Sequence, residues 1–173
     1  MKNILTALAL IATPVLAQIP CYDTNLGANL GLIDESFSAP RPLGFTFTYG
    51  GVPYTDVQVC SNGYIVFGTG SPLGSDYTPT AYELCNNAIS RVALLWLDFN
   101  PGAAGSGGVH ANAVAATANH PAYFTVTLNG VYRWNTTIPH TAQLRLIDGG
   151  AAAHAARCDR VERHRPRHRQ LRA

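Results

Sequence analysis

The sequence lacks the local motifs by which several enzyme classes are recognised. It contains no G-x-S-x-G elbow, no H-E-x-x-H and no phosphate-binding loop ending in G-K-S or G-K-T. The glycine-rich stretch 102–108 is not followed by lysine, so we interpret it as a connection between strands. We therefore expect a protein without enzymatic activity and without a cofactor.

Lysine is also almost missing, and the charges are unevenly distributed. Residues 18–150 contain no lysine, and their four arginines and eight carboxylates give a net charge near −4. Residues 151–173 contain seven arginines and two carboxylates, which gives a net charge near +5. The net charge of +2 for the whole chain therefore does not describe the part that we expect to fold.

Long apolar runs are missing after the first 17 residues. That first stretch has Lys2, an apolar run from Ile4 to Val15 and the ending Val15-Leu16-Ala17, which is typical of a secretory signal peptide cleaved after Ala17. A membrane anchor is the alternative, but a spanning helix needs roughly 20 apolar residues. We expect residues 1–17 to be a signal peptide, and the protein to be secreted or on the cell surface without a stable membrane span.

Four cysteines are present, at positions 21, 60, 85 and 158. Disulfides persist in exported proteins, and four cysteines allow three complete pairings. Cys60 and Cys85 are our disulfide candidates. The alternative is that Cys60 is a small buried apolar residue of a strand.

Residues 55–68 are the clearest hairpin in the chain. Two runs rich in β-branched and aromatic residues meet at Asn62-Gly63, a dipeptide that suits a two-residue type I′ turn. Such a turn places Cys60 opposite Ile65 and Val59 opposite Val66. We expect this hairpin to lie at the centre of the domain.

Further short apolar or alternating runs predict an all-β fold. Residues 44–49, 91–97, 109–117, 123–128 and 143–147 are predicted strands, and Asn129-Gly130 is a second predicted turn. Tyr77 and Tyr82 are expected to hold the long loop 68–87 in place. The fold class is therefore an antiparallel β-sandwich over residues 18–150, incomplete at the C-terminus.

Residues 151–173 do not fit this pattern. They contain no aromatic residue and few aliphatic residues beyond alanine, so we expect a disordered basic tail that supplies no partner strand after the turn at 148–150. A nucleic-acid-binding arm is one interpretation of the arginines, but it does not suit an exported protein. The abrupt change in composition instead favours a shifted reading frame, and we expect no nucleic-acid partner.

Few side chains are candidates for binding. Asp98 and Asn100 offer oxygen ligands for calcium at the end of a predicted strand, although they are better explained as caps of a corner before Pro101. His110, His120 and His140 show no metal-ligand spacing. Trp96 lies in an apolar run and is predicted to be buried, whereas Trp134, between Arg133 and Asn135, is predicted to be exposed and to contact a ligand.

Several of these segments together resemble a known family. The stretch from Gly44 to Gly68, the corner W-L-D-F-N-P at 96–101, and the runs at 123–131 and 143–150 resemble secreted bacterial β-sandwich domains related to nidogen-like extracellular modules. The resemblance covers about residues 42–148. It implies a non-enzymatic module with a structural, adhesive or ligand-binding role and an unknown extracellular protein or glycan as partner. The alternative function is a secreted hydrolase or carbohydrate-binding accessory domain, which requires acidic pairs or exposed aromatic residues in one groove.

Overall fold

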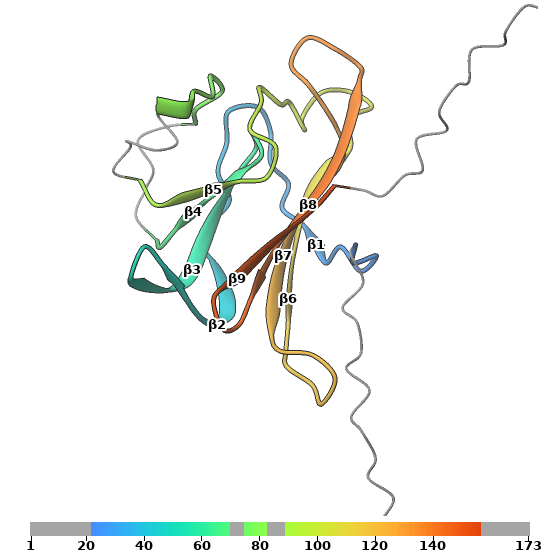
Figure 1. Cartoon of the computed structure of the whole chain (residues 1–173). Coiled ribbons are helices and arrows are strands. Elements are labelled where there is room, and N and C mark those ends of the chain that lie inside the picture. Colours follow the sequence, from blue (N-terminus) through green and yellow to red (C-terminus); the bar gives the residue numbers. More distant parts are fainter. Residues whose placement is uncertain (1–21, 70–74, 83–88, 157–173) are drawn as a thin grey trace, which may run out of the picture.

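The computed structural model describes residues 22–69, 75–82 and 89–156, which form two antiparallel sheets (Figure 1). This arrangement confirms the predicted all-β antiparallel sandwich. Within these residues, no helix is long and apolar enough to cross a membrane. The predicted signal peptide, Cys21, Cys85, Cys158 and residues 157–173 lie outside the described residues.

The larger sheet has five strands in the order β1-β6-β7-β8-β9. Its strands are β1 (Ala28–Asn29), β6 (Gly108–Val114), β7 (Tyr123–Tyr132), β8 (Pro139–Ile147) and β9 (Ala151–Ala156). The alternation predicted in β8 is confirmed, because Leu144 and Leu146 face the core while Gln143 lies on the other face, bonded to Thr127 Oγ1 at 2.9 Å.

The smaller sheet has four strands in the order β2-β3-β4-β5. Its strands are β2 (Arg41–Tyr49), β3 (Val52–Cys60), β4 (Tyr64–Phe67) and β5 (Arg91–Ala93). Two aromatic residues of β2 contact the same ring of β4: Phe47 is buried and stacks on Phe67, and Tyr49 also stacks on Phe67 although its own side chain is more exposed.

The main core lies between the two sheets and receives side chains from both. Val57, Ile65 and Phe99 are fully buried there, together with Leu128 and Leu146 from the larger sheet. Burial of one such side chain stabilises the fold by about 1.5–3 kcal/mol. The alternating pattern of the strands is thus what specifies the sandwich.

The register of the central hairpin differs from the prediction by one residue. Cys60 pairs with Tyr64 and Val59 pairs with Ile65, so the connection has three residues rather than two. A type I′ turn requires a positive φ at both central residues. Gly63 has a φ of 77°, but the φ of Asn62 is not positive, so the turn is not of type I′. The shift places Phe67 on the core face with Val59, whereas Cys60 faces away from that core.

The predicted strand 91–97 is shorter in the structure. Only Arg91–Ala93 pairs as β5, because the next residues wrap around the hairpin turn. Leu94 N and Leu95 N both donate to Gly63 O, at 2.9 and 3.0 Å, and Leu97 N donates to Asn62 O at 3.3 Å. Hydrogen bonds to the turn therefore replace those of a strand ladder.

Two further predictions are corrected by the larger sheet. Asn129-Gly130 is not a turn, because β7 continues through it with a register shift between Leu128 and Val131. Residues Ala151–Ala156 pair with β8, so the prediction that no strand follows Gly150 is wrong for these six residues. Backbone groups can extend a sheet edge without apolar side chains. The incomplete C-terminus and the shifted reading frame stay predictions.

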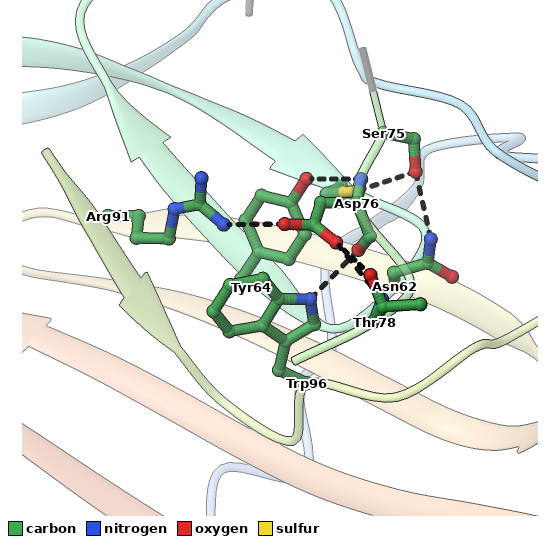
Figure 2. A network of polar contacts seen from close by, with 8 residues as sticks. Asn62, Tyr64, Ser75, Asp76, Thr78, Arg91 and Trp96 are labelled. Carbon is green, nitrogen blue, oxygen red and sulfur yellow. Dashed lines mark hydrogen bonds and ion pairs between the residues drawn. The ribbon is translucent and has the colours of Figure 1, made fainter. Parts of the chain in front are cut away.

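A second apolar cluster covers the outer face of the smaller sheet. It contains Cys60, Tyr64, Val66 and Trp96. Asp76 holds the covering loop in place: its backbone N–H donates to the Tyr64 hydroxyl at 3.0 Å, and its backbone oxygen accepts from Trp96 Nε1 at 2.8 Å (Figure 2). Tyr77 and Tyr82, predicted to hold this loop in place, are 51% and 75% exposed, and that role stays a prediction.

Candidate functional site

The hairpin turn carries a buried amide that joins several segments near one end of the sandwich. Asn62 is fully buried. Its Oδ1 accepts a hydrogen bond from Phe99 N at 2.9 Å, and its Nδ2 donates to Ser75 Oγ at 2.8 Å and to Glu35 Oε1 at 3.1 Å. The Asn62 amide therefore fixes the position of Glu35 and of the residues around Phe99.

The segment around Phe99 in turn holds the end of β7. Phe99 forms an isolated antiparallel bridge with Arg133. Trp134 N donates to Asp98 O at 2.8 Å, and Asn100 N donates to Tyr132 O at 2.9 Å. Trp134 therefore lies next to the corner 98–100 because backbone hydrogen bonds join the two segments.

The loop between β7 and β8 presents Trp134 to solvent. Thr136 bonds back to Arg133 O through its N–H at 3.0 Å and its hydroxyl at 2.9 Å. Asn135 adopts a positive φ of 55°, which lets the chain turn sharply. As predicted, the Trp134 side chain is half-exposed and Trp96 is buried, with exposed fractions of 50% and 8%.

A hollow of about 250 Å³ lies beside Trp134 and is lined by carboxylates and aromatic rings. We name it the acidic hollow; its lining residues are Asp34, Glu35, Tyr77, Asp98 and Trp134. Carboxylate oxygens of the three acidic residues lie within 4.8 Å of one another. Three carboxyl groups are thereby brought together in one hollow with two half-exposed aromatic side chains.

The electrostatics of the acidic hollow disfavour full ionisation. Partial burial raises the pKa of Asp98 above its usual range, and the negative charges of Glu35 and Asp34 raise it further, while Arg133 lowers it. Partial burial and the charge of Glu35 likewise raise the pKa of Asp34. A positive charge in the hollow would therefore stabilise the ionised carboxylates.

A second hollow, of about 570 Å³, also borders Trp134. We name it the polar hollow; it is lined mainly by amide, hydroxyl and guanidinium groups from Asn100, Arg133, Asn135, Thr136 and Thr137. The Asn100 Oδ1 atom is buried and has no hydrogen-bond partner within the described part of the chain. Trp134 is thus shared by two hollows of different chemistry.

The structure separates some predicted site residues and joins others. Asp98 and Asn100, predicted as possible calcium ligands, line different hollows. Asp98 instead joins Asp34 and Glu35, which the sequence analysis did not select. These three oxygen donors suit a hard cation such as Ca²⁺. The consecutive acidic pair at 34–35 was visible in the sequence, but its proximity to Asp98 was not.

Other candidate chemistry is dispersed. His110, His120 and His140 do not converge on a metal site. Among the described residues, the acidic hollow holds the only group of three or more His, Cys, Asp or Glu side chains that is close enough to bind a metal ion. Cys60 is buried, which raises the pKa of its thiol, and its Sγ lies 3.3 Å from Ser75 Oγ. Cys85 lies outside the described residues, so the Cys60–Cys85 pairing stays a prediction.

Comparisons with known proteins bear on the family. A search of curated proteins and a search of solved structures each returned no match to this chain. A scan against protein-family models matched the family described as NIDO related over residues 20–146. This range spans more than half of the chain, and it includes the central hairpin, the corner at 96–101 and Trp134. The chain therefore belongs to the NIDO-related family, as its resemblance to nidogen-like modules predicted.

Proposed function

We propose that this protein is a non-enzymatic extracellular module that binds a partner, a protein or a glycan, through the surface around Trp134. The observation that carries the proposal is the half-exposed Trp134 side chain between the acidic hollow and the polar hollow. Membership in the NIDO-related family supports an extracellular setting.

The physical properties of this surface suit binding. A tryptophan offers a large apolar area with few rotatable bonds, so little conformational entropy is lost when it is covered. The backbone bond from Trp134 N to Asp98 O and the two bonds of Thr136 to Arg133 O hold the loop in one conformation before binding. Pre-organisation of this kind increases affinity because less ordering is needed on association.

The experiment is a binding screen on a glycan array and against extracellular proteins, followed by substitution of Trp134. Trp134→Ala should abolish binding to the partner found. Val52→Ala is the control, because Val52 is 48% exposed and lies in the β2–β3 hairpin, at the opposite end of the molecule from the β7–β8 loop (Figure 1). Binding that survives Trp134→Ala unchanged would refute the proposal.

One observation favours the second candidate, a secreted hydrolase or carbohydrate-binding accessory domain. The acidic hollow combines carboxylate oxygens that lie within 4.8 Å of one another with Tyr77 and Trp134, and glycosidases that retain configuration use two carboxyl groups about 5–5.5 Å apart. The raised pKa of Asp98 suits a general acid. Hydrolysis of a polysaccharide panel that Asp98→Asn abolishes would favour this candidate over the non-enzymatic module.

A further inference from the structure

We propose that the acidic hollow receives the cationic side chain of a lysine or arginine from a partner protein. This inference rests on the proposed function and names the class of partner for the same surface. Three observations support it: the negative charge of the hollow, its aromatic walls, and a second place in this fold where the same kinds of group surround an arginine.

Charge complementarity is the first argument. Asp34, Glu35 and Asp98 bring three carboxylates together, and Arg133 is the cation whose charge acts on Asp98. One guanidinium does not balance three carboxylates. An incoming positive charge would therefore be attracted to the hollow and would reduce the repulsion between the carboxylates.

The aromatic walls are the second argument, because they distinguish a side-chain cation from a metal ion. Tyr77 and Trp134 are each about half-exposed, at 51% and 50%, and both line the hollow with the carboxylates. Calcium takes oxygen ligands and gains nothing from ring faces. An ammonium or guanidinium group is attracted both to carboxylates and to the faces of tyrosine and tryptophan rings, and its alkyl stem packs on them.

The third argument is that the fold already contains such a complex within its own chain. The Arg91 guanidinium carbon lies 4.5 Å from the centre of the Trp96 ring and 5.1 Å from that of Tyr64. Its NH1 atom is 3.5 Å from Asp76 Oδ2 (Figure 2). A tyrosine, a tryptophan and a carboxylate thus surround one cation on the outer face of the smaller sheet.

The acidic hollow presents the same three kinds of group at the surface. Tyr77 corresponds in kind to Tyr64, Trp134 to Trp96, and the carboxylates to Asp76. The groups are also held in place, since Glu35 accepts from Asn62 and the backbone of Asp98 accepts from Trp134. A basic side chain of a second protein can therefore occupy the hollow without major rearrangement of its walls.

The test is an NMR titration of the full chain with hexalysine, followed through the two tryptophan indole N–H signals. We expect hexalysine to shift the signal of Trp134 and to leave that of buried Trp96 in place. Asp98→Asn should weaken the interaction about fivefold, the effect typical of losing one partner of a close charge pair. Asp148→Asn is the matched control, because it removes the same charge from an exposed position in the β8–β9 turn and should change the affinity less than about twofold.

The other outcomes separate this inference from the proposed function. Equal weakening by Asp98→Asn and Asp148→Asn would show attraction to the overall charge alone and would overturn the inference. A Trp134 shift with calcium chloride but not with hexalysine would overturn it in favour of a metal site. If Trp134→Ala abolishes binding of an uncharged glycan while hexalysine leaves the Trp134 signal unmoved, the inference fails and the proposed function stands.

Discussion

Replacement of Asn62 by alanine should destabilise the domain far more than expected for a hairpin turn residue. The Asn62 side chain is fully buried, and its Oδ1 is the acceptor for Phe99 N. Removing the amide leaves that N–H without a partner in a site closed to water, which costs about 1–3 kcal/mol. The two Nδ2 bonds, to Ser75 and Glu35, are lost as well. Because Glu35 is exposed and can bond to water instead, this loss adds only about 1 kcal/mol in total.

The free energy of unfolding should therefore fall by about 2–4 kcal/mol, which is a large part of the 5–15 kcal/mol typical of a domain. For a domain of this size, a loss of about 3 kcal/mol lowers the Tm by about 10 °C. Urea unfolding followed by tryptophan fluorescence measures the change directly, since Trp96 is buried in the second apolar cluster.

Asn129→Ala provides the matched control, because Asn129 also precedes a glycine but is exposed in β7. We expect its effect to stay within about 0.5 kcal/mol. If Asn62→Ala is no more destabilising than Asn129→Ala, the central role given to the Asn62 amide is refuted.

Four further substitutions test other parts of the structure. Gly63→Ala should cost more than about 2 kcal/mol in urea unfolding, because an added Cβ would overlap the Leu95 carbonyl oxygen at a positive φ. Arg91→Met should cost about 1–3 kcal/mol, since it leaves the Asp76 carboxylate without its ion-pair partner. Asp98→Asn should raise the urea midpoint at pH 7 but hardly at pH 3. The pKa of Asp98 is raised in the folded state, so its ionised form destabilises the fold at pH 7. This destabilisation disappears as the pH falls through the folded-state pKa, because the carboxyl group becomes protonated. A larger gain at pH 3 than at pH 7 would contradict this explanation. Trp134→Ala should leave the Tm within about 2 °C while it abolishes partner binding, since the side chain is half-exposed.

Local patterns were sufficient to predict most of the sheet. Alternating residues predicted β7 and β8 because the two faces of a strand differ in burial with a period of two. The dipeptide Asn62-Gly63 correctly located a hairpin, but its length was wrong because contacts with distant residues, such as Phe99, determine the conformation of the turn. The strand predicted at 91–97 was too long for the same reason, since residues 94–97 bond to the turn.

The acidic hollow was beyond prediction from the sequence. Asp98 and Trp134 were selected singly, one as an oxygen donor and the other as an exposed aromatic residue. Their contact depends on the bridge between Phe99 and Arg133, which joins residues 34 positions apart. Glu35 enters the hollow through its bond to Asn62, which no local pattern indicates.

The burial of the Asn62 amide also affects the dynamics of the surface around Trp134. The Phe99 N–H is bonded to a side chain in the core, so its hydrogen should exchange with deuterium only when the whole domain unfolds. The corner 98–100 and Trp134 therefore belong to the same cooperative unit as the two sheets. A partner that binds there would slow exchange throughout the sandwich, instead of ordering one loop locally.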